Sequence, residues 1–275
     1  MPTQVYEIYQ QGSSLHLVMD LIEPLPGLKQ SDLFEWIVTK GPLNTVDACK
    51  LLYQSASAIQ CLNEHHIIHR DLKPENILLG PEKFDKIRVM DYGLARCFME
   101  DSAGSLEVQE ATANVGSGGY QAPETIAKYQ QSTQYGKACD VWSLGVILYI
   151  CVRGAPPFGL GAKARIADIQ RGKYAAMSGA KWKVVDEHVK DLIKRMLVVD
   201  PRNRITVEEI MADPEVRRHA GIVAAAPVAA PRPVPEPPRA AVASSGGSRS
   251  SSGGGRAMSR EEEDAKIKER ASCCV

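Results

Sequence analysis

The chain has 275 residues, of which 44% are hydrophobic, and its 33 Lys and Arg residues balance 33 Asp and Glu residues. This size and composition allow one sizeable core with an extension, and the zero net charge excludes a whole-chain argument for nucleic acid or an anionic membrane as partner. The seven scattered cysteines lack C-x-x-C pairs, and no apolar run reaches the roughly 18 residues of a membrane helix. We therefore predict a soluble intracellular protein, cytoplasmic or nuclear, with reduced thiols and no transmembrane segment.

The first predicted elements are two strands followed by two helices. Residues 4–10 and 15–22 are rich in β-branched, aromatic and aliphatic residues, and the Gly- and Ser-containing stretch between them predicts a turn. Residues 32–38 and 45–64 carry apolar residues at helical spacing, and Thr45 is a plausible N-cap of the second helix. The chain therefore opens with a strand pair and continues into helices.

Further along the chain we predict a short strand, a polar segment and a buried helix. The strand signal covers residues 86–90, and residues 100–117 are too polar to build a core, which makes them a candidate functional loop. Residues 141–152 are apolar on all sides, so we expect a helix in the middle of a domain that is too short to cross a bilayer. After His219 the chain is rich first in Ala and Pro and then in Ser and Gly, which predicts disorder before a short charged segment.

Three short motifs carry the strongest functional signal. Residues 69–76 read His-Arg-Asp-Leu-Lys-Pro-Glu-Asn, residues 91–93 read Asp-Tyr-Gly, and residues 122–124 read Ala-Pro-Glu. A chance string in a turn does not account for all three motifs in this order. They resemble the motifs of eukaryotic serine/threonine protein kinases, and the turn at residues 156–158 and the segment DLIKRML-VVDPRNRIT resemble the calcium/calmodulin-dependent kinase group.

This resemblance implies an α+β, protein-kinase-like fold with a mostly α-helical C-terminal lobe and only remnant strands of the N-terminal lobe. Residues 1–22 would be the remnant of the small lobe and the hinge, residues 23–219 the large lobe, and residues 220–275 a disordered tail. The family's phosphate-anchoring Lys, its partner Glu and the glycine-rich loop have no counterpart before the hinge. Because losing such a contact to the phosphates costs about 10² to 10³ in rate, we expect the chain as written to be weak or inactive and a longer product to encode these parts.

The resemblance assigns chemical roles to four residues of the motifs. Asp71 would be the catalytic carboxylate that orients the substrate hydroxyl and accepts its proton, and Lys73 would lie beside the transferring phosphate. Asn76 and Asp91 would bind Mg²⁺, with Asp91 as the principal ligand. A lysine at position 73 matches the serine/threonine class, so the predicted reaction transfers the γ-phosphate of ATP to Ser or Thr of protein substrates.

The resemblance also predicts an adenine pocket. Met19 would be the gatekeeper at the end of the second strand, the backbone of Asp20 and Ile22 would face adenine, and Leu78 would close the pocket from below. Tyr92 stands where the family usually has Phe, and its added hydroxyl needs one hydrogen-bond partner.

Between the Asp-Tyr-Gly and Ala-Pro-Glu motifs the resemblance implies an activation loop. Arg70 is the residue type that pairs with an activation-loop phosphate. Thr112 is the candidate phosphosite, with Ser105 and Ser102 as alternatives and a plain solvated threonine as the competing interpretation. Ser117 matches the Thr that braces the catalytic Asp and Lys in the family.

Three further matches are structural. The resemblance implies a buried ion pair between Glu124 and Arg204, a brace from Asp140 to the backbone of the catalytic loop, and a packed core position for His69. These side chains would hold the loop in place, and none of them would act on a substrate.

The expected partners are protein substrates with Ser or Thr acceptors, and Glu75 and Asp32 are candidate acceptors for a basic residue upstream of the target. The tail has no clear basic amphipathic helix, so calmodulin binding is not supported. Cys273 and Cys274 are candidates for acylation, with an unmodified tail as the alternative. The alternative function is a pseudokinase-like protein-binding module without catalysis, whose partner binding would survive Asp71→Asn.

Overall fold

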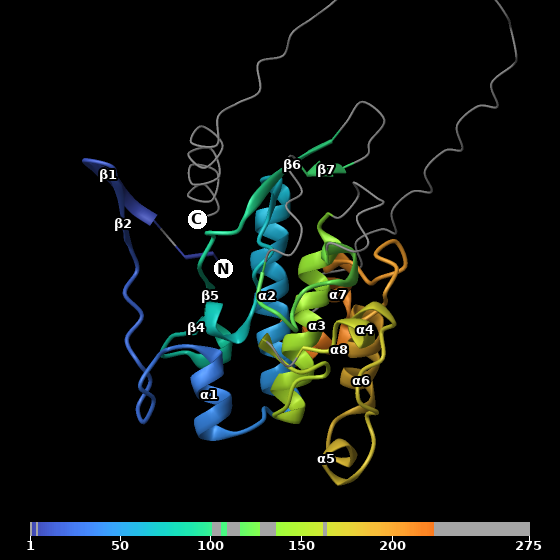
Figure 1. The fold of residues 1–275 in the computed structure, drawn as a ribbon. Helices are drawn as coiled ribbons and strands as arrows, with labels where there is room; N and C mark the ends of the chain where they lie inside the picture. Colours follow the sequence, from blue (N-terminus) through green and yellow to red (C-terminus); the bar gives the residue numbers. More distant parts are fainter. Residues whose placement is uncertain are drawn as a thin grey trace, which may run out of the picture.

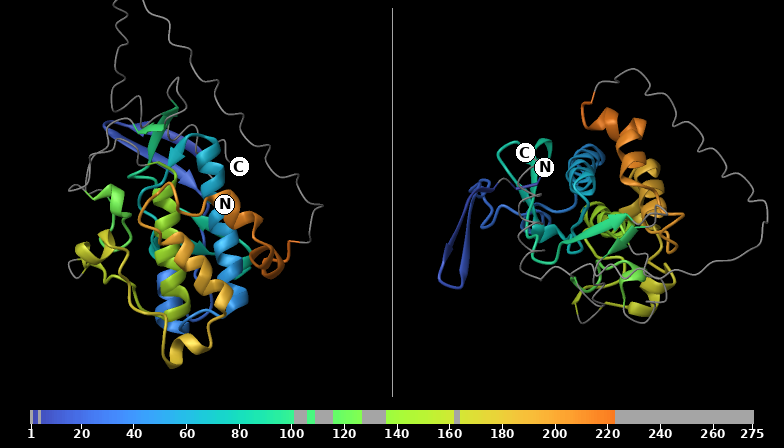
Figure 2. Two further views of the ribbon diagram at one scale, coloured as in Figure 1. Left: turned by 90° about the vertical axis from the view of Figure 1, so that its right-hand side faces the viewer. Right: turned by 90° about the horizontal axis from the view of Figure 1, so that it is seen from above.

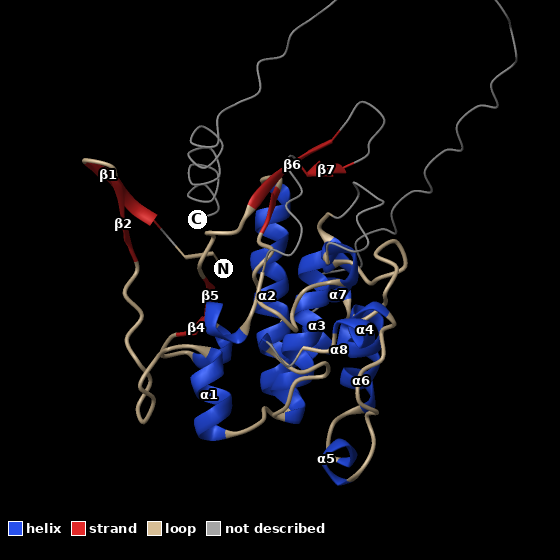
Figure 3. Ribbon diagram, in the orientation of Figure 1, coloured by secondary structure: helices blue, strands red, loops and turns tan. Residues whose placement is uncertain are grey.

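The computed structural model describes residues 2–3, 5–100, 106–108, 116–126, 136–161 and 164–222. Helices form the body of the molecule and the strands form three small sheets, which confirms the predicted α+β class (Figures 1 and 3). The helices are α1 (Leu33–Lys40), α2 (Thr45–Glu64), α3 (Ala138–Arg153), α4 (Ile166–Gln170), α5 (Ala180–Lys183), α6 (Glu187–Met196), α7 (Val207–Ala212) and α8 (Pro214–His219). The strands are β1 (Val5–Gln11), β2 (Ser14–Met19), β3 (Ile67–Ile68), β4 (Ile77–Leu79), β5 (Ile87–Val89), β6 (Arg96–Glu100) and β7 (Leu106–Val108). Most of the predicted tail, from residue 223 on, lies outside the described residues.

Strands β1 and β2 form the predicted antiparallel hairpin, with Ile8 opposite Leu17 and a turn at Gly12, whose φ is +62°. The hairpin stands beside the helical body in the view of Figure 1 and in the view from above on the right of Figure 2. Several of its large apolar side chains are exposed, and a two-stranded hairpin by itself is marginally stable at best in water. Before the hairpin, the backbone N–H and the hydroxyl of Thr3 both donate to the carbonyl of Val89 in β5, at 3.0 and 2.9 Å.

Two other small sheets frame the predicted catalytic loop. Strands β4 and β5 pair antiparallel with Ile77 opposite Val89 and Leu78 opposite Arg88. Strand β6 pairs with both β3 and β7. The loop between β3 and β4 and the segment after β5 therefore meet on one side of the molecule, although they are separate in sequence.

The core is built around helix α2 and helix α3, which pack against each other, while α7 and α8 pack on α2 and α6 packs on α3. Every residue from Cys139 to Val152 is buried, which confirms the helix predicted from all-round apolar character. A Cβ added to Gly145 would lie 2.8 Å from the Cβ of Met196, so glycine allows α3 and α6 to approach closely. None of the helices in the described part of the chain combines the length and the apolar character needed to span a membrane.

The start of α2 differs from the prediction by one residue. Thr45 is the first helical residue, and the N-cap is Asn44, whose side-chain oxygen accepts the N–H of Asp47 at 2.9 Å. Asn and Thr both cap helices well, so residue type alone did not show whether Asn44 or Thr45 is the N-cap. Asn44 takes the role because its backbone is extended while Thr45 is already helical.

A buried ion pair joins the Ala-Pro-Glu turn to the C-terminal part of the body, as predicted. Arg204 donates to both carboxylate oxygens of Glu124, at 2.7 and 2.9 Å, and also to the carbonyls of Val198 and Ala138. Its guanidinium lies 5.1 Å from the ring centre of Trp142. The side chain of Arg204 is 0% exposed and that of Glu124 is 9% exposed, so this pair is largely shielded from solvent.

Arg204→Met should lower the free energy of unfolding by about 3 to 5 kcal/mol, because the carboxylate of Glu124 would stay buried without its partner. Arg202→Met is the matched control. Arg202 makes a similar two-pronged contact with Asp200 two residues earlier in the chain, but its side chain is 84% exposed. Urea unfolding of both variants should show a large loss of stability for Arg204→Met and no measurable loss of stability for Arg202→Met. Equal losses would contradict this account of the buried pair.

Candidate active site

The backbone of the loop after β3 is held by one buried carboxylate. Asp140, in the first turn of α3, accepts the backbone N–H groups of His69 and Arg70, both at 2.9 Å. Asp140 has no exposed surface, and this burial raises its pKa above the ordinary value, although the two N–H bonds oppose the shift. The predicted brace from Asp140 to the catalytic loop is confirmed.

His69 is fully buried, as predicted, and links the loop to the strand that precedes Asp91. Its Nε2 lies 3.0 Å from the carbonyl of Met90, and its Nδ1 accepts the backbone N–H of Asp71 at 3.3 Å. An Nδ1 that accepts must carry no proton, so this network assigns the proton to Nε2, which then donates to Met90. The ring of Tyr92 packs against the imidazole, and the Tyr92 hydroxyl finds its partner in the Val89 carbonyl at 2.8 Å.

Asp71, Lys73 and Ser117 form one hydrogen-bonded group. The Oδ1 of Asp71 accepts the backbone N–H of Ser117 at 2.8 Å, and its Oδ2 accepts the ammonium of Lys73 at 2.9 Å. Lys73 also donates to the Ser117 hydroxyl at 3.3 Å, so the brace expected of Ser117 is present. Burial lowers the pKa of Lys73, but the hydrogen bond and charge of Asp71, with the charges of Glu75 and Asp91, outweigh burial and raise that pKa.

A glycine allows the segment before Ser117 to reach the loop. Gly116 has a φ of +111°, and a Cβ added there would lie 2.8 Å from the carbonyl oxygen of Arg70. A side chain at this position would therefore clash with the backbone and also strain its own conformation. Sequence reasoning missed this residue, because the clash depends on two segments that are distant in sequence.

Asn76 and Asp91 lie on adjoining segments. The side-chain amide of Asn76 donates to the carbonyl of Asp71 at 2.9 Å, which leaves its side-chain oxygen for another partner. The Asn76 carbonyl accepts the N–H of Met90 at 3.0 Å, directly before Asp91. Asp91 is exposed and has a left-handed backbone, with φ of +65°. A carboxylate and an amide oxygen on adjacent backbones fit the oxygen ligands that Mg²⁺ prefers.

The predicted adenine-facing residues lie at the edge of the hairpin. Met19 ends β2 and is 40% exposed, and the carbonyl of Ile22 accepts the hydroxyl of Ser31 at 2.9 Å. The carbonyl of Ser31 in turn accepts the N–H of Leu79 at 2.6 Å. These contacts tie the segment after β2 to strand β4, and the half-buried Leu78 of β4 lies beside it.

The carboxylate of Asp20 has two protein partners that sequence reasoning did not find. The hydroxyl of Tyr6 donates to it, and this bond raises the pKa of Tyr6. The guanidinium of Arg88 faces it at 3.5 Å. Side chains alternate between the two faces of β5, so Arg88 lies on the other face from the buried Ile87 and Val89. No local sequence pattern, however, indicates that its distant partner is Asp20.

The regulatory predictions are tested only in part. Arg70 is largely buried, has a left-handed backbone with φ of +67°, and donates from Nε to the carbonyl of Leu94 at 2.9 Å. Thr112, Ser105 and Ser102 lie outside the described residues. A phosphate partner for Arg70 therefore stays a prediction.

The two expected acceptors for a basic substrate residue differ in accessibility. Glu75 is exposed and lies within the loop between β3 and β4. Asp32 is only 6% exposed, and its carboxylate caps α1 by accepting the N–H of Glu35 at 2.8 Å. Because the helix cap already uses the buried carboxylate, the structure argues against Asp32 in this role.

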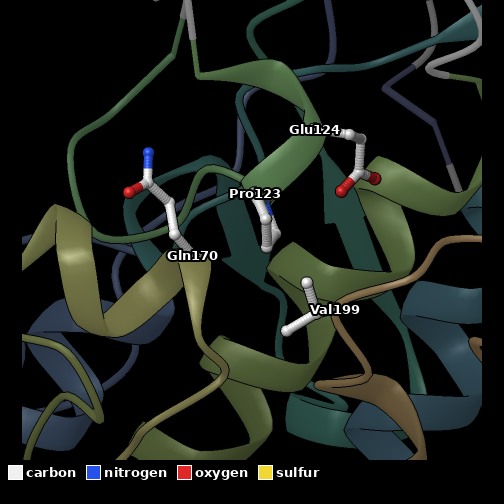
Figure 4. A pocket seen from close by; sticks show the side chains of 4 residues that line it. All are labelled: Pro123, Glu124, Gln170 and Val199. Atoms are coloured by element: carbon white, nitrogen blue, oxygen red, sulfur yellow. The ribbon is translucent and has the colours of Figure 1, made fainter. Parts of the chain in front are cut away.

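A small pocket lies apart from these residues, between the Ala-Pro-Glu turn and α4. Pro123, Glu124, Gln170 and Val199 line it (Figure 4). The carboxylate of Glu124 is already bound by Arg204. The lining therefore offers no acid or base for chemistry, and the reactive groups gather around Asp71.

Asp140→Asn should lower the free energy of unfolding by about 1 to 3 kcal/mol, because an amide NH₂ would face one backbone N–H and leave that buried donor unpaired. Asp32→Asn is the control: it also changes a buried Asp that accepts a backbone N–H, but Asn and Asp cap helices equally well. Thermal or urea unfolding should show a clear loss of stability for Asp140→Asn and none for Asp32→Asn. Losses of equal size would contradict the role assigned to Asp140.

Comparison with known proteins agrees with this geometry. Residues 3–215 match the protein kinase domain family. The chain is 36% identical over 219 residues to a calcium/calmodulin-dependent protein kinase type 1 of Macrobrachium nipponense, covering 79% of this chain and 58% of that protein. It is also 36% identical over 213 residues to the protein of the same name from Caenorhabditis elegans, covering 77% of this chain and 56% of that protein.

The chain thus spans little more than half the length of these curated relatives. The family match nevertheless covers most of the chain, including the residues described above. The chain belongs to the protein kinase domain family.

Proposed function

We propose that the protein transfers the γ-phosphate of ATP to Ser or Thr residues of protein substrates. The observation that carries this proposal is the group formed by Asp71, Lys73 and Ser117. It places a carboxylate and an ammonium 2.9 Å apart on a backbone that Asp140 holds. Phosphoryl transfer needs positioned groups of these two kinds more than covalent help from the protein.

Asp71 would act on the substrate hydroxyl, and Lys73 would act on the phosphate that is transferred. The carboxylate of Asp71, already oriented by the Ser117 N–H, would accept a hydrogen bond from the substrate hydroxyl and later its proton. Lys73, whose ammonium is held by Asp71, would stabilise charge on the moving phosphate. Ser117 holds the two side chains in place relative to each other, because its backbone N–H binds Asp71 and its hydroxyl binds Lys73.

Asn76 and Asp91 would hold Mg²⁺ through an amide oxygen and a carboxylate. The hydrogen bond from the Asn76 amide to Asp71 orients the Asn76 oxygen, and the exposed Asp91 leaves room for phosphate oxygens. The bound ion would supply positive charge that neutralises the nucleotide phosphates. Met19, the backbone of Asp20 and Ile22, and Leu78 would contact the adenine ring.

The proposed substrates are proteins with a Ser or Thr acceptor and an upstream basic residue that meets Glu75. The names of the relatives refer to calcium and calmodulin, and we do not extend that dependence to this chain. Cys49, Cys139 and Cys151 are buried free thiols, which fits the proposed cytoplasmic or nuclear location.

Asp71→Asn should lower the rate of phosphate transfer to a Ser or Thr peptide at least about 10²-fold, because an amide cannot accept the hydroxyl proton. The measurement is mass spectrometry of a peptide incubated with the full chain, ATP and Mg²⁺. Asp191→Asn is the control, since Asp191 lies exposed on α6 and meets only Arg195 at 3.9 Å. No transfer by the wild-type protein in an assay sensitive enough to detect the weak activity expected of this chain, transfer that persists in Asp71→Asn, or transfer to Tyr alone would overturn the proposal.

Glu75→Gln should raise KM roughly two- to fivefold for a peptide with an upstream Arg, because an exposed ion pair contributes at most about 1 kcal/mol. The KM for the same peptide with Ala in place of that Arg should not change. Glu82→Gln serves as control, as Glu82 is also exposed but lies beyond β4. Equal changes for both peptides would argue against a contact between Glu75 and the basic residue.

A further inference from the structure

Both ends of the β1–β2 hairpin are fastened to the same short strand. At the entrance, Thr3 donates twice to the carbonyl of Val89. At the exit, the carboxylate of Asp20 faces the guanidinium of the neighbouring Arg88. Because the rest of the hairpin stands beside the body (Figure 1), these two neighbouring residues of β5 fix its orientation.

The exit contact is better shielded than a typical surface ion pair. The side chains of Arg88 and Asp20 are 18% and 20% exposed, so solvent and salt screen their attraction only partly. The Nε of Arg88 is buried and has no hydrogen-bond partner among the described residues. At 3.5 Å it is too far from Asp20 for a good hydrogen bond, so the carboxylate compensates it by charge. Tyr6 donates to the other oxygen of Asp20 and limits its rotation.

The position of Arg88 in the sheet directs it toward the proposed base site. Arg88 is opposite Leu78 in the β4–β5 ladder, so the two side chains lie on one face of that ladder. The neighbours of Arg88 on β5, Ile87 and Val89, are fully buried on the other face. Leu78 is the residue proposed to lie beneath adenine, and Arg88 therefore lies next to the base site.

The segment after β2 is held at two points. The side chain of Asp20 is bound by Tyr6 and Arg88, and the carbonyl of Ile22 is bound by the hydroxyl of Ser31. Among the described residues, none donates to the Asp20 carbonyl or accepts from the Ile22 N–H. These are the two backbone groups that an adenine edge could use.

We propose that Arg88 is a positioning residue for the nucleotide base: with Tyr6 it holds the Asp20 carboxylate so that the backbone of Asp20 and Ile22 meets the adenine edge. The inference rests on the proposed function and deepens it. Because β5 leads directly to Asp91, the same strand would set the base contacts and the metal-binding carboxylate relative to each other. Loss of the ion pair should weaken nucleotide binding and leave the groups around Asp71 in place.

The test compares Arg88→Met, Asp20→Asn and the double variant in the full chain. Arg88→Met should raise both the Kd for Mg–ATP, measured by calorimetry, and the KM for ATP roughly tenfold, while kcat at saturating ATP and the KM for peptide stay within about twofold. Arg88→Lys should restore most of the affinity, since it restores the charge. The double variant should be no worse than either single variant, because both remove the same contact. Arg195→Met on α6 is the matched control, with no expected effect on ATP affinity.

Each other outcome has a distinct meaning. Unchanged ATP affinity in Arg88→Met and Asp20→Asn, even with a lower melting temperature, would overturn the positioning role and leave the proposed function intact. Additive losses in the double variant would show that Arg88 contacts the nucleotide by itself, which also overturns the inference. A wild-type chain that binds no Mg–ATP would overturn the proposed function and this inference together. Should Arg88→Met not fold, Asp20→Asn supplies the variant that lacks the contact, and Arg88→Lys the variant that keeps it.

Discussion

The proposed catalytic loop depends on a carboxylate that is buried at the start of a buried helix. Asp140 satisfies two consecutive backbone N–H groups of the loop, and its own charge is compensated mainly by them. Helix α3 is surrounded by the core along its whole middle, so its first turn has little freedom to move. The loop is therefore also restrained, because any shift of His69 or Arg70 would leave a buried donor or acceptor unpaired.

The remaining contacts of the site extend outward from that anchor. His69 connects the loop to Met90, and Asn76 connects it to the same residue through the backbone. The carboxylate of Asp71 and the side-chain oxygen of Asn76 are oriented by hydrogen bonds through their other atoms. Such side chains need little reorganisation when a substrate arrives, which is how positioned polar groups lower a barrier.

The hairpin and the helical body are held in place by different kinds of contact. Helices α2 and α3 are held by continuous apolar packing, whereas β1 and β2 expose apolar side chains and meet the body at a few polar contacts on β5. Packing of the first kind is spread over many residues and tolerates small changes. Attachment of the second kind rests on single residues such as Arg88, so one substitution can alter the geometry of the proposed base site without unfolding the core.

The sequence alone determined the motifs, the leading strand pair with the two helices that follow it, and the buried character of residues 141–152, because each rests on residues that are close in the chain. The resemblance supplied the roles of Asp71, Asn76 and Asp91 and the pairing of Glu124 with Arg204. Only the tertiary structure decided that Asn44 caps α2, that Asp32 is buried under its own helix cap, and that Arg88 faces Asp20. These depend on backbone conformation or on contacts across the fold, which local patterns do not encode.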